Sequence, residues 1–160
     1  MSDRDDAPVT EETVEELLDR VGFDPEEGVL TRRQAEVLAL RQQGIPQSTI
    51  AEMLGTSRAN VSSVEASART NVDKARETVA FAEALKAPVQ VEVEPGTDLY
   101  DVPQMVYDAC DEASVKVNHT APDLMKVISD EAGDAISGRD VSEALLVGVT
   151  AEGSVRVRRP

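Results

Sequence analysis

The sequence is poor in cysteine and aromatic residues, with one Cys, no Trp, two Phe and two Tyr among 160 residues. A single cysteine excludes a disulfide framework within the chain and is typical of a reducing compartment. So few aromatic side chains argue against a surface that stacks single-stranded bases. The chain also lacks a long apolar run and begins with polar and acidic residues. We therefore expect neither a membrane span nor a signal peptide, and predict a cytoplasmic protein.

Residue types that hold metals or act as nucleophiles are equally scarce. A zinc site needs several His or Cys ligands, whereas the chain offers only Cys110 and His119. Cys110 falls in an apolar helical pattern and is expected to be a small core residue, and His119 is expected to lie in a loop. Segment 94–98 has neither the length nor the lysine of a phosphate-binding loop. We therefore predict no enzymatic activity, no metal site and no cofactor.

Positive charge is scarce overall, and the formal net charge is −15. Segment 31–76 is the exception, since it holds seven basic and four acidic residues and has a net charge of +3. Contacts to phosphate need basic residues, so only this segment suits a nucleic acid. Lysine is rare beside arginine and acidic residues number 31, a bias that predicts a protein from a high-salt cytoplasm. An acidic protein of an ordinary cytoplasm is the alternative.

A helix-turn-helix is predicted over residues 47–65. Ile50 and Leu54 are one helical turn apart, so both can face inward from the first helix. Gly55 follows, where the chain must bend through a conformation that glycine adopts without a Cβ clash. Thr56 or Ser57 can cap the second helix by accepting from its free N–H groups. An ordinary helical hairpin with a glycine turn is the alternative.

A third helix is predicted before this pair. Thr31 and Gln34 have the spacing of a capping box, and the helix is expected to end shortly before Pro46. Pro46 stands where Ser or Thr would cap the next helix, so we expect that helix to have a poorer cap. Residues 1–28 form an acidic extension, expected to be partly disordered, with a short helix beginning near Thr13.

The second helix of the motif is predicted to continue to about residue 86. Apolar residues recur along it in steps of three and four, without glycine or proline before Pro88, which approaches a heptad pattern. We expect a seam between two copies, because helix-turn-helix proteins commonly bind paired half-sites. The same residues could instead pack on the chain's own C-terminal domain. The expected seam residues are Val72, Ala75, Val79, Ala82 and Leu85.

Residues 87–160 are predicted to form a small α+β domain. Valines at 89, 91 and 93 alternate with polar residues, as in a strand with one buried face. The expected order is β-α-β-α-β-β, with later strands at 115–117, 144–149 and 155–157 and helices beginning near Val102 and Pro122. The complete prediction is an α+β protein with an acidic extension (1–28), a helix-turn-helix domain with its long connecting helix (29–86), and this C-terminal domain (87–160).

The solvent-facing arc of the second motif helix is the expected DNA-reading surface. Small side chains there would let the helix enter the major groove, while Arg, Asn and Glu can pair with base edges. The expected base contacts are Arg58, Ala59, Asn60, Ser62, Ser63 and Glu65. Phosphate contacts fix position rather than sequence, and those expected are Thr31, Arg32, Arg33, Ser57 and Arg69.

Several stretches resemble the archaeal Tfx family of DNA-binding regulators. They are Leu30–Leu38, Ile50–Ser62, Ala75–Thr78, Leu85–Val89 and Pro95–Pro103, and the resemblance spans about residues 29–160. The family's helix-turn-helix is similar to the promoter-reading fourth region of bacterial sigma factors. The resemblance implies a transcriptional regulator that binds double-stranded DNA sequence-specifically. With the acidic composition, it also implies a halophilic archaeal source.

Two other functions are considered. A protein–protein adaptor would dock its helices on the transcription machinery, and scattered rather than contiguous arginines would favour it. A small-molecule sensor would need a closed pocket in the C-terminal domain, near Tyr100 or Tyr107. The sequence identifies no effector.

Overall fold

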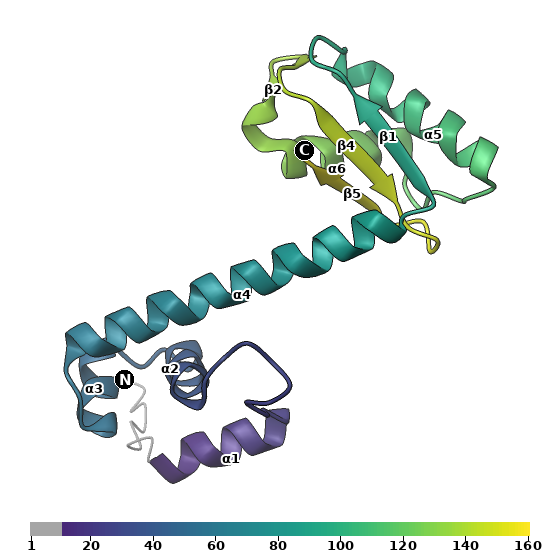
Figure 1. Ribbon diagram of the computed structural model, residues 1–160. Helices are drawn as coiled ribbons and strands as arrows, with labels where there is room; N and C mark the ends of the chain where they lie inside the picture. The colour runs from purple at the N-terminus through teal and green to yellow at the C-terminus, as the bar shows by residue number, and fades with distance from the viewer. Residues whose placement is uncertain (1–10) are drawn as a thin grey trace, which may run out of the picture. The chain divides into compact units, whose positions relative to one another are not determined.

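The structure, a computed structural model, describes residues 11–160. It divides into two compact units, Met1–Thr78 and Val79–Pro160, and the boundary falls inside one continuous helix, α4 (Arg58–Lys86) (Figure 1). Each unit has a hydrophobic core of its own. The division therefore lies within the long helix rather than after it. The disorder expected for the first residues concerns positions outside the described range.

The first unit contains α1 (Glu11–Val21), α2 (Arg32–Gln42), α3 (Gln47–Leu54) and α4 as far as Thr78. Val14 and Leu18 of α1 are buried in the same core as Leu40 and Ile50. α1 is thus part of the helix-turn-helix unit, although the sequence suggested an extension separate from it. The three helices predicted for the motif are confirmed.

Local signals set the ends of these helices. The Thr31 hydroxyl accepts from the Gln34 backbone at 3.2 Å, and the Gln34 side chain accepts from the Thr31 backbone at 3.0 Å, which completes the capping box. Gly55 ends α3 with a φ of 67°, in the left-handed region that glycine adopts without strain. The Ser57 hydroxyl accepts from the Asn60 backbone at 3.1 Å and caps α4.

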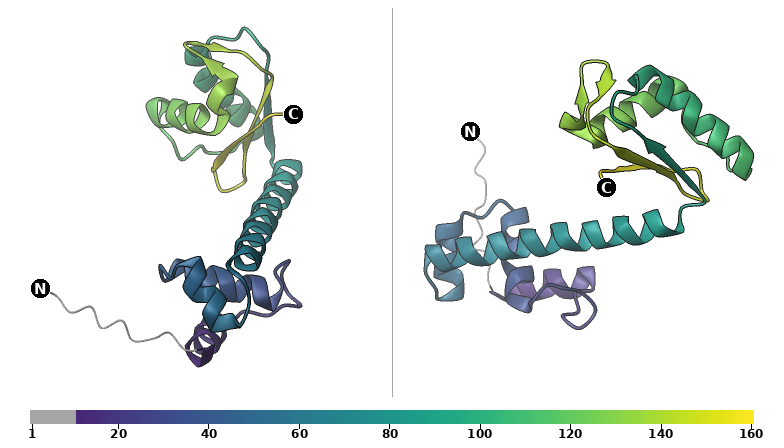
Figure 2. Two further views of the ribbon diagram at one scale, coloured as in Figure 1. Left: turned by 90° about the vertical axis from the view of Figure 1, so that its left-hand side faces the viewer. Right: turned by 45° about the horizontal axis from the view of Figure 1, so that its top comes forward.

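The second unit is a three-stranded antiparallel sheet with helices packed against one face (Figure 1, Figure 2). The strand order is β1-β4-β5, so β4 lies in the middle. α5 packs mainly on β1 and α6 on β5. The elements are β1 (Val89–Val93), α5 (Val102–Ala113), α6 (Ala121–Ala132), β2 (Ile136–Ser137), β3 (Asp140–Val141), β4 (Leu145–Val149) and β5 (Val155–Arg158), with short 3-10 turns at Leu99–Asp101 and Gly133–Ala135.

The predicted strand at 115–117 is wrong, so the observed order is β-α-α-β-β-β-β. Ser114 adopts a left-handed φ of 55° after α5, and the Val115 backbone donates back to the Cys110 carbonyl at 2.9 Å. Val115 and Val117 are half-buried against the core, which explains the alternation that suggested a strand. The segment pairs with no strand. Its backbone is hydrogen-bonded to the β4–β5 turn only near its end, where the Asn118 N–H donates to the Gly153 carbonyl at 3.3 Å. None of the helices in the described range is long and apolar enough to cross a membrane.

Candidate nucleic-acid interface

The first turns of α4 present a solvent-facing arc opposite a buried one. Val61 and Ala68 are fully buried in the first unit, which fixes how the helix is turned about its axis. Residues on the other side of the helix consequently point away from the core. Five of the six expected base contacts are exposed there: Arg58, Ala59, Asn60, Ser62 and Ser63.

Two adjoining hollows open between the first turn of α3 and the first turns of α4. The larger, of about 650 Å³ and open to solvent, is lined by Arg41, Pro46, Gln47, Ser48 and Arg58. The second, of about 520 Å³, is lined by Gln47, Arg58, Ala59 and Ser62. Arg58 and Gln47 border both hollows. Within residues 11–160, no ion pair or hydrogen bond is found for the Arg58 side chain, so its guanidinium is available to a ligand.

The sixth expected base contact, Glu65, does not face outward. Only 6% of the residue is exposed, and its carboxylate accepts from Arg41 Nε at 2.6 Å. Arg69 Nε lies 3.7 Å from the other carboxylate oxygen. Glu65 sits at the edge of the buried face of α4, and the pairing with Arg41 turns its side chain inward. We therefore remove it from the set of base contacts.

The expected phosphate contacts are all exposed at the surface of the first unit. Thr31 and Ser57 already serve as helix caps. The Arg32 guanidinium lies 3.5 Å from the Glu36 carboxylate and 3.9 Å from the Glu15 carboxylate. The Arg33 guanidinium lies 3.4 Å from the Glu36 carboxylate. Exposed ion pairs of this kind contribute only about 0–1 kcal/mol, so a phosphate could replace the carboxylate.

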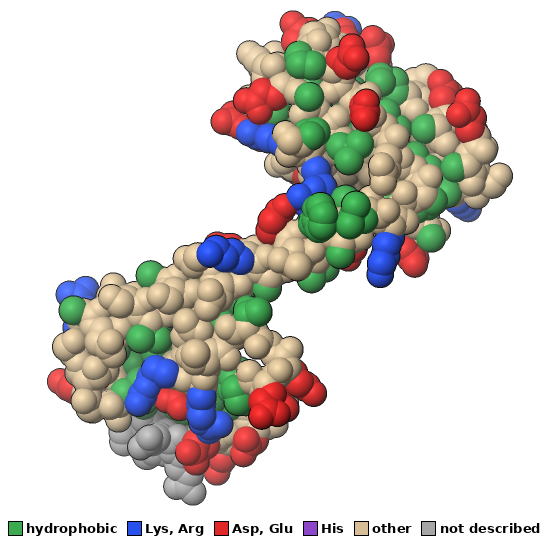
Figure 3. Space-filling model, viewed as in Figure 1, with side chains coloured by type: hydrophobic (Ala, Val, Ile, Leu, Met, Phe, Trp, Pro, Cys, Tyr) green, Lys and Arg blue, Asp and Glu red, His purple; other side chains and the backbone are tan. Residues whose placement is uncertain are grey.

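Charged side chains are unevenly placed over this unit. Figure 3 shows acidic groups gathered over α1 and the loop that follows it, while basic groups lie in separate places over the remaining helices. The basic residues visible on this face thus form no single continuous field. On this face, such a distribution provides little long-range attraction for an anionic ligand.

Sequence reasoning missed four residues of the larger hollow, namely Arg41, Pro46, Gln47 and Ser48. Gln47 and Ser48 begin α3, and the helix-turn-helix geometry brings this end of α3 beside the start of α4. That juxtaposition could have been derived from the motif. The position of Arg41 could not, because Arg41 comes from the end of α2 and is held there by Glu65, 24 residues away in the sequence.

In the second unit, the Cys110 side chain is buried in the core, and the backbone of His119 takes part in a structural hydrogen bond. Burial, and then the nearby Asp111 carboxylate, raise the pKa of the Cys110 thiol, which therefore keeps its proton. The backbone carbonyl of His119 accepts from the Tyr107 hydroxyl at 2.7 Å. Across the described part of the chain, no group of three His, Cys, Asp or Glu residues could hold a metal ion.

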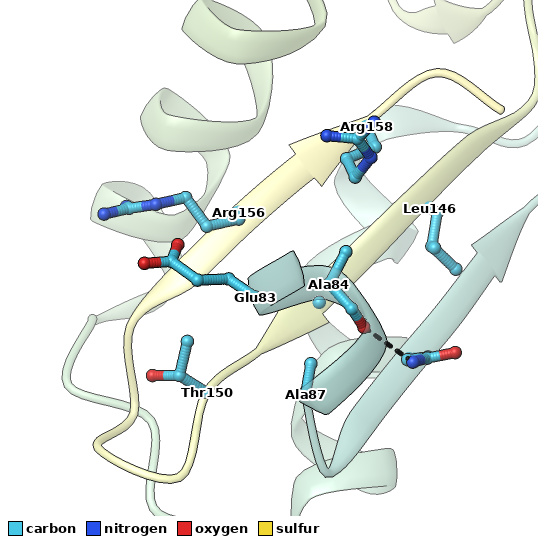
Figure 4. Close-up of a pocket in the computed structure, with 9 residues that line it drawn as sticks. Glu83, Ala84, Ala87, Leu146, Thr150, Arg156 and Arg158 are labelled. Atoms are coloured by element: carbon cyan, nitrogen blue, oxygen red, sulfur yellow. Dashed lines mark hydrogen bonds between the residues drawn. The ribbon is translucent and has the colours of Figure 1, made fainter. Parts of the chain in front are cut away.

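A further hollow lies between the last turns of α4 and the sheet face that α5 and α6 leave open (Figure 4). Small residues line both of its sides, among them Ala84 of α4 and Gly148 of β4, and Gln90 Nε2 donates to the Ala84 carbonyl at 2.8 Å. Its cavity volume is only about 10 Å³, about enough for one water molecule. It does not reach Tyr100 or Tyr107, near which a sensor would have its pocket.

Comparison with known proteins divides the chain within α4. Residues 28–74 match region 4 of sigma-70 factors, and residues 75–157 match the C-terminal part of the DNA-binding protein TFX family. The two matches together cover residues 28–157, which leaves α1 outside them. They meet close to the boundary between the two compact units.

Relatives match along most of their length. A protein of Haloarcula marismortui, named as a transcriptional regulatory protein with that role marked as unproven, is 58% identical over 144 residues, covering 90% of this chain and 91% of its own. A similarly named protein of Methanocaldococcus jannaschii is 36% identical over 132 residues, covering 82% and 96%. The DNA-binding protein Tfx of Methanothermobacter thermautotrophicus is 34% identical over 128 residues, covering 80% and 93%.

These matches agree with both halves of the fold, a helix-turn-helix followed by a small α+β unit. The Haloarcula relative comes from a halophilic archaeon, in agreement with the acidic, lysine-poor composition. Such regulators are not a class of enzymes. The chain belongs to the Tfx family of DNA-binding transcriptional regulators.

Proposed function

We propose that this protein binds double-stranded DNA sequence-specifically and regulates transcription by reading the major groove with the first turns of α4. The observation that carries the proposal is the exposed arc of α4, from Arg58 to Ser63, bordered by the open hollow at the start of α3. An α-helix fits the major groove, where each base pair presents a distinct pattern of donors and acceptors.

The residues of the arc have complementary roles in this proposal. The Arg58 guanidinium can donate two hydrogen bonds to guanine, and the Asn60 amide can pair with adenine. Ala59, Ser62 and Ser63 are small enough for the helix to approach the base edges closely. Around them, Thr31, Arg32, Arg33, Ser57 and Arg69 would contact phosphates and fix the position of the helix on the duplex.

High salt makes this proposal compatible with the acidic chain. At molar salt the Debye length is about 3 Å, so carboxylates distant from the interface scarcely repel DNA. The same salt weakens binding that depends on counterion release, which puts more weight on direct base contacts. The whole proposed interface lies in segment 31–76, which has a net charge of +3, whereas the rest of the chain is strongly acidic.

Selection of binding sites from a random double-stranded library, in molar potassium chloride, tests the proposal. We expect an enriched sequence, and a dimer would give an inverted repeat with half-sites about one helical turn apart. If nothing is enriched while the protein remains folded in that salt, DNA reading is contradicted. The second candidate, an adaptor that docks on the transcription machinery, would then lead. The separate placement of basic groups in Figure 3 favours that candidate.

We further propose that the protein acts as a homodimer through α4. Val79 is 57% exposed and Leu85 67% exposed, which is unusual for large apolar side chains on a helix. Together with half-buried Val72 and Ala75 and exposed Ala82, they continue the apolar stripe along the helix. A second copy of α4 would cover this stripe and provide paired reading helices.

Replacing Val79 and Leu85 together by glutamate is expected to convert the dimer to a monomer, because like charges would face each other across the seam. The measurement is the mass by sedimentation equilibrium in molar salt. Val21→Glu/Val29→Glu is the matched control, since Val21 is 66% exposed, Val29 is 60% exposed and both lie off α4. A wild-type monomer, or equal dissociation in the control, would contradict the seam.

A further inference from the structure

Arg41 lies at the end of α2, where two interactions hold its guanidinium. Its Nε donates to the Glu65 carboxylate at 2.6 Å, and one terminal nitrogen donates to the Ile45 carbonyl at 3.1 Å. The Glu65 side chain is only 8% exposed, whereas the Arg41 side chain is 34% exposed. The Arg41 guanidinium therefore contacts a buried carboxylate on one side and is open to solvent on the other.

The exposed side of Arg41 borders the larger hollow, which it lines together with Gln47, Ser48 and Arg58. A guanidinium has five N–H donors. Two of them are used in the bonds to Glu65 and Ile45, which leaves three for a ligand. Arg58, which is proposed to read a base, borders the same hollow and adds positive potential to it without itself binding the phosphate. Two cations beside one open hollow suit an anionic ligand.

We propose that Arg41 is a contact to a DNA phosphate and that Glu65 is the positioning residue that holds the Arg41 guanidinium towards the hollow. This inference rests on the proposed function and adds to it one contact absent from the sequence-based set. The ligand is a phosphodiester group of the backbone, because Arg41 lines only the hollow at the start of α3 and not the second hollow, which Ala59 and Ser62 of the exposed arc line.

Glu65 fits this role better than base reading. A carboxylate that is buried and already bonded to Arg41, with Arg69 at 3.7 Å, has little capacity left for a cytosine amino group. By fixing Arg41 before DNA binds, it reduces the side-chain entropy lost on binding. The hollow also adjoins the first turn of α3, where Pro46 provides no side-chain cap for the backbone N–H groups, so a phosphate oxygen could accept from them.

The test compares Glu65→Gln with the double variant Arg41→Gln/Glu65→Gln. The double variant has the net charge of the wild type and leaves no buried charge without its partner, so we expect it to fold. The control, Glu16→Gln/Arg20→Gln, also removes one acid and one arginine, both exposed on α1. Dissociation constants are measured by fluorescence anisotropy for the selected duplex and a scrambled one, over a range of salt, after thermal denaturation has verified folding.

We expect the double variant to lose roughly tenfold in affinity on both duplexes and to show a salt slope lower by about one, as for one lost phosphate contact. The α1 control should bind as the wild type does. Glu65→Gln should weaken binding to both duplexes by about threefold, although it removes a negative charge, and should leave base preferences unchanged.

Wild-type affinity and salt slope in the double variant would overturn the contact at Arg41. Tighter binding by Glu65→Gln would overturn the positioning role, since Glu65 would then act only as a negative charge near DNA. A changed preference of Glu65→Gln at one base pair would also overturn the positioning role, because Glu65 would then read a base. If the double variant unfolds, Glu65→Gln, which is nearly isosteric, still decides the positioning role. Failure of the wild type to bind either duplex would instead refute the proposed function itself, and this inference with it.

Discussion

Replacing Gly153 by alanine is expected to destabilise the C-terminal unit by roughly 3 kcal/mol or more, through backbone strain and overpacking together. Gly153 lies in the β4–β5 turn with a φ of +87° and is buried. A Cβ there would overlap the Lys116 carbonyl oxygen and lie 3.0 Å from the Asn118 amide nitrogen. The neighbours cannot easily withdraw, because Asn118 donates to the carbonyls of Gly153 at 3.3 Å and Glu152 at 2.6 Å.

Gly96→Ala separates the two causes. Gly96 has nearly the same φ, +90°, but a Cβ at this position meets no atom within 4 Å. Its replacement should cost only the strain of the left-handed conformation, about 1–2 kcal/mol. Urea denaturation of both variants, followed by circular dichroism, gives the two free energies of unfolding. Equal losses would show that the packing of Lys116 and Asn118 against the turn contributes nothing.

The elements that the sequence predicted correctly are those that depend on neighbouring residues. Thr31 and Gln34 form their capping box within one turn of helix, and Gly55 ends α3 through its own backbone conformation. The direction of Arg58 and Asn60 follows from the position of Val61 in the core, because side-chain directions repeat every 3.6 residues. Such features need no knowledge of distant contacts.

Failures of the prediction arise where a distant residue decides the outcome. Helical periodicity puts Glu65 at the edge of the buried face, where its side chain could turn either way. Its direction is set by Arg41, which lies on another helix. Likewise, the valines at 115 and 117 alternate as in a strand, but the segment pairs with no strand, and packing against the core explains the pattern. α1 joined the first core because Val14 and Leu18 found partners on α2.

Replacing Arg58 by alanine is expected to reduce affinity for the selected duplex by about tenfold to a hundredfold, equivalent to 1–3 kcal/mol, and to relax preference at one base pair. Arg58 is exposed at the first position of α4 and borders both hollows, so its side chain can reach base edges at the mouth of the groove. A scrambled duplex offers no matching guanine, so the loss measured on it should be small.

Arg32→Ala is the matched comparison, because Arg32 is also an exposed arginine at the first position of a helix, α2. Arg32 is proposed to contact phosphate, so its loss should weaken binding about equally on the selected and scrambled duplexes and lower the salt slope by about one. Titrations of both variants on both duplexes provide the four ratios of variant to wild-type dissociation constant that the comparison needs. If Arg58→Ala weakens binding equally on the two duplexes, Arg58 is a phosphate contact, and base reading must then depend on Asn60 and the two serines beyond it. That outcome would move the reading surface along α4, towards Ser62 and Ser63, without removing it from the helix.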